Sequence, residues 1–131
     1  MVYPVTLVEM PVIKWVKKPL EGQVTFTYPN ESGGGGDEFW NIGTSNDPIQ
    51  ISRTLDDSSV QNYFYEYGAF GNVTKETDPI GRVFEYRYAA NNIDLLEKRQ
   101  TKSGANDLLG KWIFNNTQHL PNIAIDGSGQ R

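Results

Sequence analysis

Large apolar side chains stand at alternate positions on both sides of two glycine-ended tetrads, in the stretch YFYEYGAFGNVTKETDPIGRVFEYRY (63–88). A period of two places successive side chains on opposite faces of a β-strand, so one face becomes aromatic and the other polar. The tetrads GAFG (68–71) and DPIG (78–81) lie about one strand length apart, and their final glycines permit the positive φ of a tight turn. The spacing therefore predicts consecutive antiparallel hairpins.

Similar alternation and frequent turn residues extend along most of the chain. Only 37% of the residues are hydrophobic, and there are thirteen glycines and seven prolines. We therefore expect an all-β fold, in which antiparallel β-hairpin repeats form a meander or a solenoid-like strip of sheet. The tetrad NDLL (106–109) predicts one short helical turn. The predicted strands are Val12–Lys17, Val24–Tyr28, Ile49–Ser52, Asn62–Tyr67, Val73–Thr77, Arg82–Tyr88, Leu95–Thr101, Lys111–Asn115 and Leu120–Ile125.

We divide the chain into two regions. Residues 1–48 are expected to form an N-terminal β segment with a glycine-rich loop, and residues 49–131 a repeat region. The loop, ESGGGGDE (31–38), lacks the Lys-Ser/Thr pair of a phosphate-binding loop, and no helical pattern follows it. We therefore interpret it as a flexible connection.

An internal repeat organises the second region. The tyrosine pair 65/67 recurs at 86/88, and Gly71 and Gly81 are ten residues apart, so each half-repeat is one strand and one turn. A later copy has Trp112 and Phe114 at the tyrosine positions. In that copy residues 126–129 stand where the DPIG tetrad stood, and residues 91–106 are an insertion between the copies.

The repeat resembles the YD repeat of RHS proteins, over about residues 49–131 and only weakly before them. Departures are visible: the Tyr-Asp pair reads Tyr67-Gly68 and Tyr88-Ala89, and Gly-Arg reads Gly71-Asn72. These changes put a role for the missing aspartate in doubt and leave the strand–turn spacing intact. The residues that match the repeat are Tyr65, Tyr67, Gly71, Val73, Asp78, Pro79, Gly81, Arg82, Tyr86 and Tyr88, with Asp126 and Gly129 in the later copy.

The resemblance implies a structural function. In RHS and insecticidal-toxin-like proteins the repeats form a long strip of sheet that spirals into a shell around a toxic C-terminal domain, and teneurins have a related shell outside the cell. By resemblance the chain is a non-catalytic wall segment, expected to be a piece of a larger bacterial protein that is secreted or at the cell surface. Its partners would be the rest of the shell or the enclosed domain, and no cofactor is implied. No signal peptide is visible at the N-terminus of the chain.

Two other functions use the aromatic residues and the strand edges. Exposed rings can stack on sugars, so the chain is alternatively a carbohydrate-binding module. A strip of sheet with open edges can also pair with a second copy, which makes a homodimer through edge strands the other alternative. The candidate sugar-stacking residues are Trp15, Trp40, Tyr63, Tyr65, Tyr86, Tyr88 and Trp112.

Composition excludes several classes of chemistry. The chain has no cysteine, which removes disulfides, thiolate metal sites and cysteine nucleophiles. Its formal net charge is −4 and no long basic run occurs, so we expect no nucleic-acid partner. No segment approaches the roughly 18 apolar residues that a membrane-spanning helix requires.

The remaining polar candidates also favour structure over catalysis. His119 has no partner that the sequence identifies, and the adjacent Asp56 and Asp57 are typical of a turn. Asp37 and Glu38 lack the spacing of a calcium loop. The DPIGRV stretch (78–83) resembles the start of an autoproteolytic segment of RHS shells but lacks the later glycines, which favours an ordinary turn. We expect no enzyme activity and no metal site.

Overall fold

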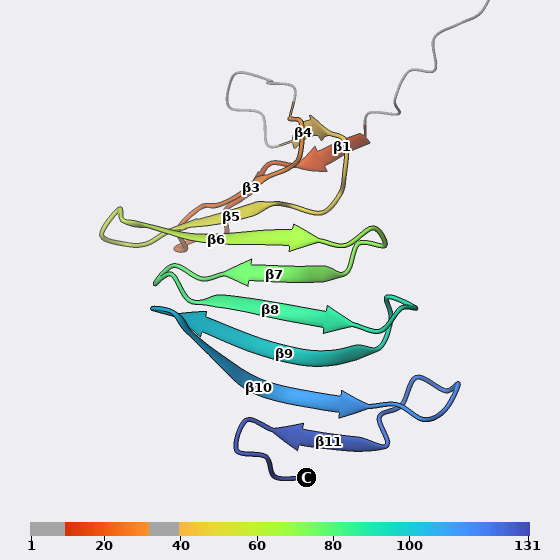
Figure 1. The fold of residues 1–131 in the computed structure, drawn as a ribbon. Coiled ribbons are helices and arrows are strands. Elements are labelled where there is room, and N and C mark those ends of the chain that lie inside the picture. Colours follow the sequence, from red (N-terminus) through yellow and green to blue (C-terminus); the bar gives the residue numbers. More distant parts are fainter. Residues whose placement is uncertain (1–9, 32–39) are drawn as a thin grey trace, which may run out of the picture. The chain divides into compact units, whose positions relative to one another are not determined.

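The computed structural model describes residues 10–31 and 40–131, and this part of the chain contains strands and no helix (Figure 1). The predicted all-β class and antiparallel meander are confirmed. The main sheet has the hydrogen-bonding order β11-β10-β9-β8-β7-β6-β5-β3-β2 and is not closed, while β1 and β4 form a separate pair. The strands are β1 (Met10–Ile13), β2 (Trp15–Val16), β3 (Val24–Thr27), β4 (Trp40–Gly43), β5 (Gln50–Thr54), β6 (Val60–Tyr67), β7 (Val73–Thr77), β8 (Val83–Tyr88), β9 (Leu95–Lys102), β10 (Ala105–Ile113) and β11 (Ile123–Asp126).

The chain separates into two compact units, residues 1–63 (unit 1) and 64–131 (unit 2). In unit 1, β3 pairs with both β2 and β5, and β1 pairs with β4. The buried hydrophobic side chains of the described residues are Val12 and Tyr28, both in this unit. The Tyr28 hydroxyl donates to the carbonyl of Ile13 at 2.9 Å, which anchors the ring. Burial, and then the nearby Glu31 carboxylate, raises the pKa of Tyr28.

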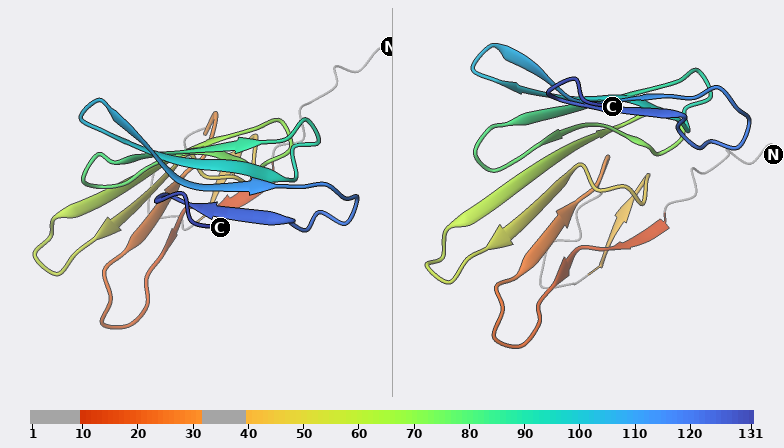
Figure 2. Two further views of the ribbon diagram at one scale, coloured as in Figure 1. Left: turned by 60° about the horizontal axis from the view of Figure 1, so that its bottom comes forward. Right: turned by 90° about the horizontal axis from the view of Figure 1, so that it is seen from below.

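Unit 2 is a meander in which each strand pairs with the next, from the second half of β6 through β11 (Figures 1 and 2). Register shifts occur in β6 between Glu66 and Tyr67, and in β8 between Arg87 and Tyr88. Each shift falls within a tyrosine pair, directly before its second tyrosine, and a bulge increases local strand twist. The two halves of the repeat therefore share an irregularity as well as a pattern.

Residues 106–109 form a strand, so the predicted helical turn is wrong. They belong to β10, where Asn106 pairs with Thr101 and Asp107 with Gln100. The preceding turn is only Ser103 and Gly104, with φ of 52° and 86°. Positive φ at both central residues is typical of a type I′ hairpin turn, whose twist matches that of the flanking strands. Pairing along β9 outweighs the weak local preference of these residues for a helix.

Other strand boundaries differ from the prediction in unit 1 and at β11. The predicted strand 12–17 is interrupted at Lys14, because its first part pairs with β4 and its second with β3. β4 was not predicted, and β11 begins at Ile123 because Pro121 cannot donate a ladder hydrogen bond. The glycine-rich loop from Ser32, including Asp37 and Glu38, lies outside the described residues.

One turn geometry recurs along the chain. In each case the first residue donates its N–H to the carbonyl of the fifth, and the fourth donates back to the carbonyl of the first. The fourth residue always has positive φ, between 67° and 84°. The turns with this geometry are 55–59, 68–72, 78–82 and 126–130, and the turn 89–94 is a version one residue longer.

Gly81, at φ 79°, provides a direct check of this turn. Nothing lies within 4 Å of an added Cβ, so Gly81→Ala introduces backbone strain without a clash. We expect the substitution to lower the free energy of unfolding by about 1 kcal/mol, measured by urea titration. Ile80→Ala in the same turn is the control, and an equal loss in both variants would contradict the role of positive φ.

Candidate interaction surface: the two faces of the repeat sheet

The strand register of unit 2 sorts its side chains onto two unlike faces. Tyr65 pairs with Glu76, Glu76 with Phe84, and Tyr86 with Lys98, so these residues share one face. The Tyr65 and Tyr67 rings stack with centroids 6.4 Å apart. The Trp112 ring lies over Gly110, whose added Cβ would come within 2.7 Å of it. We call this side the aromatic face, comprising Tyr65, Tyr67, Phe84, Tyr86, Tyr88 and Trp112.

The tyrosine hydroxyls of β8 reach back across the sheet to β7. Tyr86 donates to Glu76 Oε2 at 3.1 Å, and Tyr88 donates to the carbonyl of Val73 at 2.8 Å. Burial and then the Glu76 carboxylate raise the pKa of Tyr86 to about 12. These rings therefore lie along the sheet, with their polar ends satisfied inside the protein.

Cationic side chains cover part of the aromatic face. The Lys98 ammonium lies 5.2 Å from the ring centroids of both Phe84 and Tyr86, and the Arg82 guanidinium lies 5.7 Å from Phe84. These separations are within cation–π range. The middle of the face is thus shielded, and Trp112, nearer its β11 side, has no cation–π partner among the described residues.

The opposite side of the same sheet is charged. Glu97 accepts from Arg99 Nε at 3.0 Å, and it also faces Arg87 and Lys111 at 3.6 and 3.8 Å. The hydrogen bond from Arg99 outweighs burial, and with the two other cations it lowers the pKa of Glu97. Lys75 pairs with Glu66 at 3.0 Å farther along this charged face. The Glu97 pairs with Arg87 and Lys111 and the Glu66–Lys75 pair cross neighbouring strands, which favours the observed register.

The matched turn residues Asp78, Pro79, Gly81 and Arg82 form a turn that the Asp78 carboxylate closes with hydrogen bonds. Asp78 is 8% exposed, and its Oδ1 accepts from the N–H groups of Ile80 and Arg82. Its Oδ2 accepts from Arg82 Nε at 2.6 Å. Burial acts to raise the pKa of Asp78, but the bonds from Arg82 and Ile80 outweigh it and the pKa is lowered. In this structure the DPIGR stretch forms a hydrogen-bonded turn.

The other turns vary this scheme. Asp126 Oδ1 accepts from the N–H groups of Ser128 and Gln130, and Gly129 has the positive φ. In the turn 68–72 a glycine replaces the aspartate, and Gly71 again has positive φ. An added Cβ on Gly68 would lie 2.6 Å from Asn72 Oδ1, which is buried without a hydrogen-bond donor. The Asn72 side chain therefore lies over Gly68, the glycine that stands in place of the aspartate.

A polar cluster that the sequence did not reveal joins two loops of unit 2. His119 Nδ1 lies 2.8 Å from Asp94 Oδ1, and Asn91 Nδ2 donates to Asp94 Oδ2 at 2.7 Å. The bond from Asn91, and then His119, lower the pKa of Asp94, which is 8% exposed. The partners are 25 residues apart in sequence, so no local pattern could predict them. A hollow of about 290 Å³ beside them is lined by Trp112 and Phe114.

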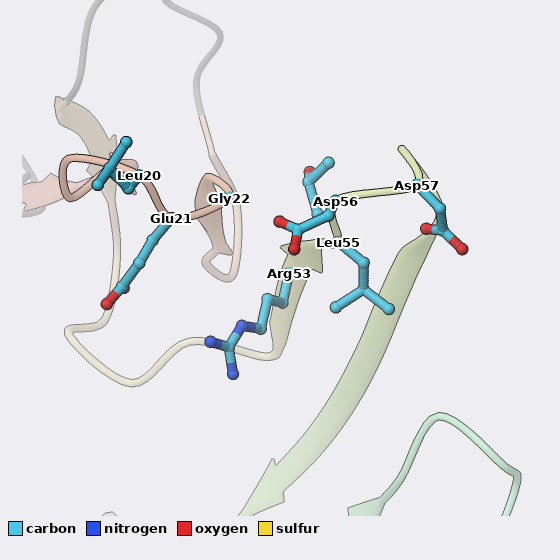
Figure 3. A pocket seen from close by; sticks show the side chains of 8 residues that line it. Leu20, Glu21, Gly22, Arg53, Leu55, Asp56 and Asp57 are labelled. Atoms are coloured by element: carbon cyan, nitrogen blue, oxygen red, sulfur yellow. The ribbon is translucent and has the colours of Figure 1, made fainter.

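Unit 1 contains the other candidate carboxylates. Asp56 and Asp57 line a hollow of about 500 Å³ between the turn at 20–22 and the end of β5, and they point in different directions (Figure 3). Asp57 Oδ1 accepts from both the N–H and the hydroxyl of Ser59. Asp57 is therefore engaged in its own turn, and the pair has no common target.

The predicted sugar-stacking residues fall in both units. Tyr65, Tyr86, Tyr88 and Trp112 share the aromatic face of unit 2, whereas Trp15 and Tyr63 belong to unit 1. The side chain of Trp40 lies outside the described part of the chain. Among the described residues, no three His, Cys, Asp or Glu side chains form a group that could hold a metal ion. No helix in this part of the chain is long and apolar enough to cross a membrane.

Comparison with known proteins found no matching family model, no similar curated protein and no similar solved structure.

Acidification tests the role of Asp78. Since its pKa is lowered, the carboxylate stabilises the fold above the unfolded value of 3.8, and this stabilisation is lost as the pH falls through the folded value. We expect Asp78→Asn to lower the urea midpoint at neutral pH. The variant should lose less further stability than the wild type between about pH 5 and pH 3.

The control for this experiment is Asp107→Asn on exposed β10, which should leave the neutral-pH midpoint unchanged. If Asp78→Asn has the wild-type midpoint and the wild-type acid response, the turn does not depend on this carboxylate.

Proposed function

We propose that the chain is a non-catalytic wall segment of an RHS/YD-repeat shell, in which its sheet continues into further hairpins. The recurring turn geometry carries this proposal. Four turns of different sequence share the same hydrogen bonds and the same left-handed fourth residue. A chain that reverses repeatedly in one way can extend a sheet without changing its cross-section.

The open edges of the sheet also support the proposal that the chain is a wall segment. β2 and β11 stand at its two ends, and an edge strand presents backbone groups that another strand can pair with. No described hydrophobic side chain of unit 2 is buried, so the aromatic face lacks the second layer of a closed core. In the proposed shell the chain lies in a secreted or cell-surface bacterial protein, and its partners are neighbouring hairpins or the enclosed domain.

Duplication of one repeat tests this proposal. A second copy of residues 68–88, inserted after Tyr88, adds 21 residues that begin and end in phase with the tyrosine pairs. We expect a folded protein whose urea m-value rises roughly in proportion to the added length, because the new hairpin joins the cooperative sheet. The m-value is measured by circular dichroism in a urea titration.

A 21-residue Gly/Ser insertion at the same site is the matched control. It should behave as a long loop and leave the m-value near that of the wild type. If the duplicated chain is unfolded, or if its m-value equals that of the Gly/Ser control, the repeat is not a modular wall unit.

Carbohydrate binding is the second candidate, and the surroundings of Trp112 favour it. Its ring has one side against Gly110 and borders the hollow that contains the Asp94–His119 pair. An aromatic ring beside polar groups suits a sugar, which has apolar and hydroxyl-bearing sides. Titration with neutral oligosaccharides should give a saturable change in tryptophan fluorescence that Trp112→Ala removes. Absence of saturation with every sugar tested would eliminate this role.

A further inference from the structure

Three exposed apolar side chains project from one end of unit 2. Phe70, Ile93 and Leu120 are 77%, 64% and 62% exposed. They lie in the β6–β7, β8–β9 and β10–β11 connections, which follow strands running in the same direction and therefore share one end of the sheet (Figure 1). Because neighbouring strands are about 4.8 Å apart, successive tips follow one another at about 10 Å. We call this the apolar end.

The loops of the apolar end contain almost no charge. Residues 68–72, 89–94 and 114–122 include only two ionisable side chains, Asp94 and His119, which are bonded to each other. At the opposite end the turn 78–82 has an ionic Asp78–Arg82 pair, and Lys102 and Asp126 are the last residues of β9 and β11. The two ends therefore differ in charge, although both contain the five-residue turn.

An aromatic residue stands behind each apolar tip. Tyr67, Tyr88 and Trp112 lie at or near the ends of β6, β8 and β10, where these strands enter the three loops. Tryptophan and tyrosine concentrate at the boundary between lipid and water, because they join an apolar ring to a polar atom. From tip to sheet the order is therefore apolar, aromatic and then charged, as at a membrane interface.

We propose that the apolar end docks on the surface of a neutral lipid bilayer. Phe70, Ile93 and Leu120 enter the acyl region, while the three aromatic residues lie at headgroup level. Unit 2 has eight Lys/Arg and eight Asp/Glu, so attachment does not depend on anionic lipid. This inference is independent of the wall function, since it rests on the loops and not on repeat identity.

A second copy of the chain fits this end less well. A stable protein interface buries about 800 Å² on each partner, and three separate side chains cannot supply that area. Fluid lipid needs no matching shape and can surround each tip individually. The exposed tips therefore favour lipid over a flat protein partner.

Flotation with phosphatidylcholine vesicles tests the proposal on the full chain. We expect wild type to float with the vesicles, and binding to persist at about 0.5 M NaCl because it is not electrostatic. The triple variant Phe70→Ser/Ile93→Ser/Leu120→Ser should bind at least about tenfold more weakly. Ile80→Ser at the opposite end, where the side chain is 65% exposed, is the matched control and should bind like wild type.

Tryptophan quenching by brominated phosphatidylcholine keeps the test valid if the triple variant fails to fold. Wild-type fluorescence should be quenched, and Trp112→Phe should remove most of that quenching. Lack of vesicle binding or of quenching in wild type would overturn the proposal. So would a folded triple variant that binds normally, or light scattering that shows a dimer dissociated by the same three substitutions.

Discussion

The five-residue turn with a left-handed fourth position is the constraint on which the repeat sheet depends. It closes with two backbone hydrogen bonds and returns the chain antiparallel to itself. Glycine takes the left-handed position at Gly71, Gly81 and Gly129, because it adopts positive φ without the strain of a Cβ. In the first turn Ser58 takes that position with φ 67°. Once the turn is fixed, the register gathers the tyrosines on one face and places carboxylate beside cation on the other.

The interactions between strands differ on the two sides of that register. On the aromatic face, the hydroxyls of Tyr86 and Tyr88 donate hydrogen bonds to acceptors on β7, which ties β8 to β7. On the charged face, Glu97 links cations from β8, β9 and β10. Neither side forms a deep core, so strand pairing and half-buried rings supply most of the order in unit 2. Such a sheet suits extension by further strands or attachment to another surface.

Local pattern predicted the parts of the fold that depend on neighbouring residues. Alternating tyrosines located β6 and β8, and the Asp-Pro-x-Gly tetrad located the turn between β7 and β8. The start of β10 was missed because residues 106–109 have little strand character and take their form from pairing with β9. The contact between Asp94 and His119 was invisible for a similar reason, since it joins loops that only the folded sheet brings together. The shielding of Phe84 and Tyr86 by Lys98 also needs the cross-strand register.

Amide hydrogen exchange measured by NMR tests the single-layer sheet most directly. In an open sheet the strands of unit 2 that are paired on both sides, β7 to β10, should exchange slowest and in one cooperative group. Amides of β11 that do not face β10 should exchange fastest among the strand residues, because nothing covers that edge in the described structure. If the amides of β11 are as protected as those of β8, the edge is covered by another part of the chain or by a second copy. That result would contradict an open repeat sheet.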